Sequence, residues 1–301
     1  MSTRASERPA AGAARPAVSD AVFARYQALV HGESGIWLAP GKKALLEGRL
    51  ASRLRELGVG SYAEYLDRAR ADPDELARLL DRITTHETRF FREPRHFELL
   101  ERQLLPRWRE AARAGSRPPR VRVWSAGCSS GEEPYSLAMS LLAGLREPGW
   151  SLEVVATDLS TPVLERARAG VYRIEQAAEI PRPLLQAYML QGTGSQEGRM
   201  KAGPELRRVV RFARLNLAAE AWPGLGTFDL VFCRNVLIYF DPPGKERVVS
   251  RLLRHLAPEG YLFLGHAESL SGTSHPLRSV IPTVYAREVA GPPAPGLRSA
   301  S

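Results

Sequence analysis

Residues 121–133, VRVWSAGCSSGEE, decide the fold class of this 301-residue chain. The run from Val121 to Ser125 is short and rich in valine and tryptophan, so it predicts a buried β-strand. A turn of small residues follows, and Glu132 opens an apolar helix that runs to Leu145. A strand, a tight turn and a helix in this order are typical of an α/β sheet.

The same alternation continues along the chain. Further strands are predicted at residues 152–157, 228–233 and 261–265, and further helices at residues 161–169 and 244–256. The pattern therefore predicts a Rossmann-like α/β fold, with a parallel sheet covered by helices on both faces. Glycine and polar residues interrupt it, and β-like pieces at 198–202 and 209–213 predict a small inserted β-subdomain at about residues 190–214.

A unit with helical periodicity precedes this sheet. Leucines recur at three- and four-residue steps, and Gly58 ends the run: Leu45, Leu46, Leu50, Leu54 and Leu57. We assign residues 18–95 to a helical N-terminal domain and linker, and residues 96–289 to the α/β domain. The ends of the chain are rich in Ala, Arg, Pro and Ser, so we expect a disordered extension at residues 1–17 and a flexible tail at 290–301.

The composition is that of a globular protein, with 44% hydrophobic and 25% charged residues. No apolar run approaches the roughly 18 residues of a membrane span, so we expect no membrane insertion. Cys128 and Cys233 are far apart and the six histidines are scattered, which predicts free thiols, a reducing compartment and no metal site. A net charge of +9 indicates either a solvated arginine-rich surface or an acidic partner, and charge alone does not choose between them.

Ligands of such sheets bind beyond the carboxyl ends of the strands. Glu132 and Glu133 begin the helix there, and two acids oppose a phosphate and suit a cationic ligand. The alternative is that they only complement the helix dipole. Asp158 follows the second strand and can accept hydrogen bonds from a ribose, or instead cap the helix that begins at Thr161.

Three further residues follow strand-like runs. Asn216 could meet an adenine and Leu217 could cover its face, while Asn235 ends the run at 228–234 and can both donate and accept. The predicted pocket suits a nucleoside but has an acidic lining. S-adenosylmethionine, which carries a sulfonium and no phosphate, fits such a pocket better than NAD.

Four long blocks in one order, and a fifth short one, identify a family: residues 83–97 (ITTHETRFFREPRHF), 123–136 (VWSAGCSSGEEPYS), 156–172 (ATDLSTPVLERARAGVY), 228–241 (FDLVFCRNVLIYFD) and 265–269 (GHAES). With these blocks the chain resembles the CheR family of chemoreceptor glutamate methyltransferases, from about residue 18 to residue 287. The resemblance implies a class I S-adenosylmethionine-dependent methyltransferase sheet with a small inserted antiparallel β-subdomain, preceded by an all-helical N-terminal domain.

The resemblance also implies the cofactor, S-adenosyl-L-methionine, the product S-adenosyl-L-homocysteine, and these contacts: Thr88, Arg92, Glu133, Asp158, Asn216, Leu217, Asn235 and Val236. His86 stands where the family has asparagine. We include His86 among the cofactor-binding residues, because an imidazole can still form hydrogen bonds and its charge can change near neutral pH.

The chemistry needs few catalytic groups. A glutamate side chain has an ordinary pKa of about 4.3, so it is already a nucleophile at neutral pH and needs no general base. Arg92 is the candidate for holding the incoming carboxylate, and its alternative role is a structural salt bridge with Glu93 or Glu133. Tyr239 either donates a hydrogen bond and shapes the wall around the methyl group, or only packs between its apolar neighbours.

The expected partners are methyl-accepting chemotaxis receptors in the cytoplasm, with the enzyme as a monomer. Lys42, Arg49 and Arg53 share one side of the leucine-rich helix, where they either lie along the acidic receptor bundle or form a solvated face. The glycines of residues 192–198 resemble a turn of family members that bind the receptor's C-terminal peptide.

Two other functions are compatible with parts of the sequence. A nucleic-acid methyltransferase would suit the charge, but Asp241-Pro242-Pro243 is followed by glycine rather than by the aromatic residue of amino-methylating enzymes. We therefore expect Asp241 to cap a helix. The second alternative is a non-catalytic module that binds S-adenosylmethionine within a signalling array.

Overall fold

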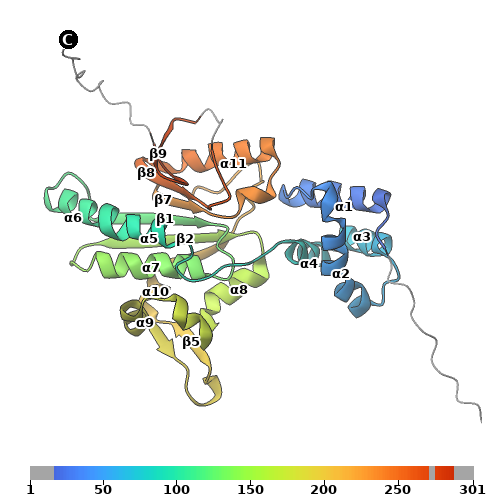
Figure 1. Ribbon diagram of the computed structural model, residues 1–301, viewed down its shortest axis with the longest axis horizontal. Helices are drawn as coiled ribbons and strands as arrows, with labels where there is room; N and C mark the ends of the chain where they lie inside the picture. The colour runs from blue at the N-terminus through green and yellow to red at the C-terminus, as the bar shows by residue number, and fades with distance from the viewer. Residues whose placement is uncertain (1–16, 271–274, 288–301) are drawn as a thin grey trace, which may run out of the picture. The chain divides into compact units, whose positions relative to one another are not determined.

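The computed structural model describes residues 17–270 and 275–287. They form two compact units (Figure 1). The helical unit comprises the chain up to Val30 and residues 38–84, and the α/β unit comprises residues 31–37 and the chain from Thr85 onward. The predicted tail and all but Ala17 of the predicted N-terminal extension lie outside the described residues.

The helical unit contains α1 (Asp20–Ser34, whose end belongs to the α/β unit), α2 (Lys43–Leu57), α3 (Tyr62–Ala71) and α4 (Pro73–Ile83). Its helix ends follow the sequence. Gly58 ends α2 with a φ of 65°, a backbone conformation that glycine adopts without strain. The Ser61 hydroxyl accepts from the backbone N–H of Glu64 and caps α3. The predicted leucine stripe is confirmed, since Leu46, Leu50 and Leu54 are buried.

The predicted basic side of α2, formed by Lys42, Arg49 and Arg53, is not a free surface, because both arginines bind other residues of the helical unit. Arg53 donates from Nε and Nη2 to the buried carboxylate of Glu75 over 2.8 and 2.5 Å. Arg49 donates to the backbone carbonyl of Ile83. Of the three residues only Lys42 is exposed, because the guanidinium groups of the two arginines bind residues of the neighbouring helix α4.

The α/β unit is built on a sheet with the strand order β6-β2-β1-β7-β8-β10-β9. Its strands are β1 (Arg120–Ala126), β2 (Ser151–Asp158), β6 (Val210–Arg214), β7 (Phe228–Cys233), β8 (Leu256–Leu264), β9 (Leu277–Ile281) and β10 (Val284–Arg287). The strands from β6 to β8 are parallel, whereas β10 pairs antiparallel with both β8 and β9. The predicted parallel sheet is thus extended by an antiparallel hairpin.

Helices cover both faces of this sheet (Figure 1). On one face lie α5 (Pro94–Leu99), a π-helical turn η2 (Leu100–Leu104), α6 (Leu105–Arg113) and α7 (Glu132–Gly144), which share a core with Val123 of β1. On the other face α11 (Pro242–Arg254) shares a core with Trp124 of the same strand. Successive side chains of a strand point to opposite faces, which is why neighbours in β1 belong to different cores.

A second, antiparallel sheet has the order β3-β5-β4, with β3 (Val171–Arg173), β4 (Met189–Gln191) and β5 (Arg199–Ala202). It corrects the predicted subdomain at about residues 190–214. The first predicted piece is β5, but the second is β6, an edge strand of the main sheet that runs parallel to β2. An edge strand buries only part of its side chains, so its pattern is the same as that of a strand in a small antiparallel sheet.

The α/β unit also contains α8 (Thr161–Ala169), α9 (Arg182–Tyr188) and α10 (Pro204–Val209). Asp241 caps α11 as predicted, because its Oδ1 accepts from the backbone N–H of Gly244 over 2.9 Å. Within the described residues, no helix combines the length and the apolar character needed to span a bilayer.

Candidate functional site

The loop after β1 is shaped by residues with positive φ. Gly127, Ser129 and Gly131 have φ values of 85°, 49° and 98°. A side chain at Gly127 would place its Cβ 2.4 Å from Cγ2 of Val236, so only glycine fits there. The loop thereby packs directly against the residues that follow β7, and the ends of β1 and β7 meet as the sequence predicts.

Asp158 joins this loop to the end of β2. Its Oδ2 accepts from the backbone N–H of Ser129 over 2.8 Å, and its Oδ1 accepts from that of Ser160 over 3.0 Å. The cap of α8 is Ser160, whose hydroxyl accepts from the N–H of Val163, so the alternative role of Asp158 as the helix cap is wrong. Each carboxylate oxygen has a further lone pair with which it can accept from a ribose hydroxyl.

The two glutamates at the start of α7 point to different neighbours. Glu132 accepts from Ser130 over 2.8 Å and from Gln176 over 3.3 Å, and burial raises the pKa of its carboxyl group. Glu133 accepts from the Ser125 hydroxyl and from Nε of Arg234, both over 2.7 Å. Of the two acids, Glu133 is therefore the one that joins the end of β1 to the residues after β7.

Arg234 is a central residue that the sequence reasoning missed. Besides Glu133, its Nη1 donates to the backbone carbonyl of Arg92 over 2.6 Å and lies 3.5 Å from Oε2 of Glu93. Its side chain is 2% exposed. An arginine at the end of an apolar strand run signals a buried acid elsewhere in the chain, because a buried guanidinium needs a partner.

The same arginine lies beside a cluster of residue types that can bind metals. Ligand atoms of Glu93, His96 and His266 lie within 4.8 Å of one another. However, Nη1 of Arg234 lies 3.2 Å from Nδ1 of His96. Burial, Arg234 and His266 lower the pKa of His96 to about 3, so its imidazole is neutral. The guanidinium supplies the positive charge of this cluster.

Glu268, in the GHAES block, organises the turn after β7. It is 3% exposed, and its two carboxylate oxygens accept from five backbone N–H groups: those of Asn235, Val236, Leu237, Ile238 and Gly265. No role is predicted for Glu268 from the sequence. A single acid in the short block after a predicted strand is the signal that could have located it.

Asn235 sits on that turn with a φ of 59°, in the left-handed region that asparagine enters more readily than most other residues. Its Oδ1 is buried and has no hydrogen-bond partner among the described residues. A buried acceptor without a donor is costly, and a bound molecule with an amino or hydroxyl group would satisfy it. This orphaned oxygen fits the amino group or the ribose hydroxyls of S-adenosylmethionine.

Asn216 and Leu217 follow β6, which pairs with β2. The Asn216 amide donates to the carbonyl of Glu33 over 2.8 Å and accepts from the N–H of Ala218 over 2.9 Å. Its side chain therefore holds the 31–37 segment of the same unit. Leu217 is buried in the core on the α11 face of the sheet. Both lie at the predicted edge of the sheet.

The segment before α5 contributes the remaining predicted residues. The carbonyl of His86 accepts from the Ser129 hydroxyl over 3.0 Å, so this segment lies against the loop after β1. Thr88 is half-buried. Arg92 donates to the carbonyl of Glu87 over 3.0 Å, and its alternative salt bridge to Glu93 or Glu133 does not form, because both acids face Arg234.

Tyr239 lies on the turn held by Glu268. Its hydroxyl donates to the carbonyl of Thr85 over 3.4 Å, and its ring is half-buried. The tyrosine therefore has a polar contact towards the 85–92 segment and is more than a packing residue. The two cysteines have no such role: Cys128 and Cys233 are free and buried, and burial raises the pKa of both thiols.

Comparison with known proteins identifies relatives over most of the chain. Residues 86–286 match the model described as CheR methyltransferase, SAM binding domain, and residues 21–84 match CheR methyltransferase, all-alpha domain. A chemotaxis protein methyltransferase 2 of Pseudomonas aeruginosa is 42% identical over 84% of this chain and 88% of its own length. Chemotaxis protein methyltransferases of Klebsiella aerogenes (91% of each chain) and Escherichia coli (90% of this chain, 92% of its own) are 41% and 40% identical.

Proposed function

Because this chain belongs to the CheR methyltransferase family, we propose that it esterifies glutamate side chains of methyl-accepting chemotaxis receptors. It is an S-adenosylmethionine-dependent methyltransferase that acts on chemoreceptors. The match of residues 86–286 to the SAM-binding domain of this family is the observation that carries the proposal. The position of Glu133, Asp158 and the orphaned Asn235 oxygen around one loop supports the same cofactor.

The cofactor is assigned to residues of the loops after β1, β2 and β7. When bound, S-adenosylmethionine supplies a methyl group on a positively charged sulfur. Asp158 would accept from the ribose hydroxyls, and the Glu133 carboxylate would face the positive charge of the ligand. Asn235 would accept through its free Oδ1, and Leu217 would contact the adenine. Thr88, His86, Asn216 and Val236 would complete the contact set.

The acceptor glutamate is assigned to Arg92 and Tyr239. A guanidinium without an acid partner can form two parallel hydrogen bonds with a carboxylate and fix the direction in which its oxygen points. Since the carboxylate is already ionised at neutral pH, the residues of the chain only need to orient it and exclude water. Tyr239 would close the wall beside it.

The proposed function is tested with labelled S-adenosylmethionine and candidate receptors. A glutamate methyl ester releases its label as methanol in base, so we expect base-labile counts in the receptor band. Arg92→Ala should abolish this transfer while part of the cofactor affinity remains, whereas the exposed Arg89→Ala should behave as wild type. Base-stable label would contradict the ester, and unchanged turnover of Arg92→Ala would remove the role assigned to that residue.

We also propose that a C-terminal receptor peptide adds a strand to the small sheet. β3 and β4 are the outer strands of that sheet, and Leu190 in β4 has 54% of its surface exposed. Titration with receptor tail peptides, followed by calorimetry, tests this contact.

The free buried cysteines are compatible with a cytoplasmic location, where we propose that the enzyme acts as a monomer.

A further inference from the structure

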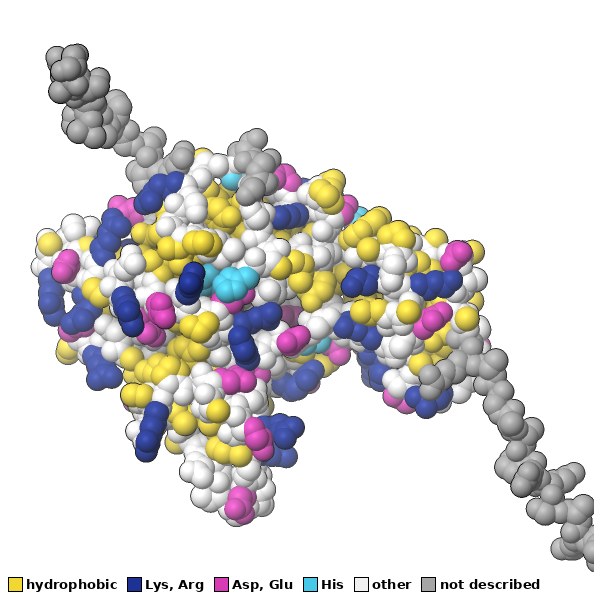
Figure 2. All heavy atoms as spheres, in the orientation of Figure 1, with side chains coloured by type: hydrophobic (Ala, Val, Ile, Leu, Met, Phe, Trp, Pro, Cys, Tyr) yellow, Lys and Arg dark blue, Asp and Glu magenta, His cyan; other side chains and the backbone are white. Residues whose placement is uncertain are grey.

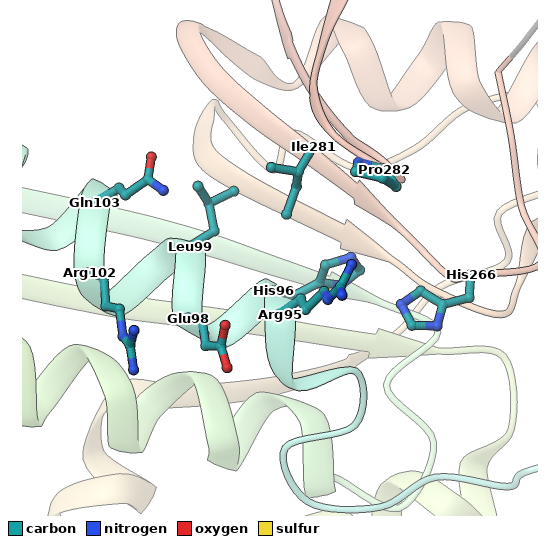
Figure 3. Close-up of a pocket in the computed structure, with 9 residues that line it drawn as sticks. All are labelled: Arg95, His96, Glu98, Leu99, Arg102, Gln103, His266, Ile281 and Pro282. Atoms are coloured by element: carbon teal, nitrogen blue, oxygen red, sulfur yellow. The ribbon is translucent and has the colours of Figure 1, made fainter.

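A groove of about 410 Å³ lies in the α/β unit between the helix formed by α5 and η2 and the turn that joins β9 to β10 (Figure 3). Leu99 lies opposite Ile281 and Pro282 across this groove and gives it an apolar floor. Arg95 and Arg102 line it from the helix side. The groove thus combines apolar surface with two guanidinium groups.

The two arginines are exposed and have no ion-pair or hydrogen-bond partner among the described residues. The nearby Arg109, by contrast, donates to Glu147 over 2.8 Å. In the same orientation as Figure 1, Figure 2 shows basic side chains and a histidine beside apolar surface on this face. Glu98 is the one acid among the residues that line the groove, so the net charge of the groove is positive.

The groove begins next to the proposed acceptor site. His266 marks this end of the groove, opposite Arg102 and Gln103 in Figure 3, and its backbone N–H donates to Oε1 of Glu93 over 3.1 Å. Glu93 directly follows Arg92 and directly precedes α5. A polypeptide that presents a glutamate to Arg92 can therefore continue along α5 and η2 without leaving the surface of this unit.

We propose that this groove binds the receptor helix that carries the target glutamate, through an acidic and apolar face of that helix. Arg95 and Arg102 are seven residues apart, roughly 10 Å at 1.5 Å per residue. Two acids seven residues apart on a partner helix have the same separation and face the same way. Apolar residues between them would contact Leu99 and Ile281. The proposal rests on the proposed function, since it extends the binding surface of the same substrate.

Charge reversal tests the groove with a matched control. The variant Arg95→Glu/Arg102→Glu is compared with Arg247→Glu/Arg254→Glu, which reverses two exposed arginines with the same spacing on α11, on the other face of the sheet. We expect the groove variant to raise the KM for receptor about tenfold, with kcat within twofold and the affinity for S-adenosylmethionine unchanged. The difference should shrink at high salt because the contacts are exposed. The control should keep the wild-type KM.

The two proposals fail in different ways. If the wild-type enzyme does not methylate receptors, the proposed function is wrong, and the groove proposal that rests on it is wrong too. If wild type methylates them and both double variants have the same KM, the groove is not a receptor contact.

Photocrosslinking locates the partner directly. The native cysteines are buried, so a thiol introduced by Gln103→Cys can be labelled selectively with a benzophenone maleimide. We expect an adduct with a receptor fragment from this position and none from Arg254→Cys. An adduct between two copies of the enzyme, or equal adducts from both positions, would overturn the proposal.

Discussion

In each unit an arginine is paired with a buried glutamate, and the two pairs differ in what surrounds them. In the helical unit, Arg53 holds Glu75, which is 1% exposed. The Tyr65 hydroxyl donates to the same carboxylate over 2.9 Å, so every neighbour is a side chain of a regular helix. The hydrogen bond from Arg53 lowers the pKa of Glu75 to about 2. This pair fastens packed helices together.

In the α/β unit, Arg234 holds Glu133 and also contacts Glu93, His96 and the backbone carbonyl of Arg92, a segment that is not a regular helix or strand. Phe91, Glu93 and Asn235 all have positive φ values, and Asn235 carries the buried oxygen without a partner. Strained loops persist only where their surroundings hold them. The same chemical pair therefore stabilises a fold in one unit and positions a site in the other, and its removal should have different consequences.

The largest effect is expected at Arg234. Arg234→Met leaves the Glu133 carboxylate buried and unpaired and releases the Arg92 backbone, so kcat/KM should fall by about a thousandfold, together with stability. Steady-state methylation and thermal unfolding measure the two losses. Arg234→Lys separates them, because it keeps the charge but not the planar fork. We expect it to regain most of the stability and remain at least about tenfold impaired in kcat; full activity would contradict a positioning role.

Arg53→Met should have its effect on stability alone. Glu75 would stay buried with only the Tyr65 hydroxyl and the exposed Arg78, 3.3 Å from its Oε2, so the free energy of unfolding of the helical unit should fall by about 3 kcal/mol. All five tryptophans lie in the α/β unit: Trp37, Trp108, Trp124, Trp150 and Trp222. The midpoint of unfolding followed by helical circular dichroism should therefore shift to a lower denaturant concentration, while the midpoint followed by tryptophan fluorescence should not. A kcat reduced more than twofold in the folded variant would show that the pair of Arg53 and Glu75 also affects catalysis.

The contrast also separates what the sequence can predict from what it cannot. Strand-end positions depend on local periodicity, and this located Glu133, Asp158 and Asn235 correctly at one edge of the sheet. The partner of Glu133 is 101 residues away, and no local pattern encodes such a pairing. The assignment of β6 failed for a related reason, because the neighbour of an edge strand is decided by tertiary packing rather than by its own side chains.

Glu268 is a third buried carboxylate, and it accepts hydrogen bonds from backbone N–H groups instead of from an arginine. Glu268→Gln replaces one accepting oxygen by an amide donor that faces N–H groups, so the turn from Asn235 to Ile238 should loosen. We expect the Kd for S-adenosylmethionine to rise about tenfold, measured by calorimetry, with little change in receptor affinity. If the Kd stays at its wild-type value, the turn does not depend on this acid for its geometry.

The smallest expected effect is on how stability depends on pH. Two buried acids, Glu75 and Glu132, should contribute to it with opposite signs. The pKa of Glu75 is lowered by Arg53, so its contribution to stability is present above the unfolded pKa and is lost as the pH falls towards about 2. The pKa of Glu132 is raised by burial, so its contribution is present below the unfolded pKa and is lost as the pH rises through the folded value.

Unfolding measured from pH 3 to pH 8 distinguishes the two acids. Glu75→Gln should flatten the acid side of the profile of the helical unit, followed by circular dichroism. Glu132→Gln should flatten the profile of the α/β unit above the ordinary pKa of a glutamate, followed by tryptophan fluorescence, because the amide stays neutral where the carboxylate must ionise. An acid with a buried arginine partner and one without it should thus give opposite slopes. If the two substitutions change the wild-type slope in the same direction, pairing with arginine does not control the charge state of these carboxylates.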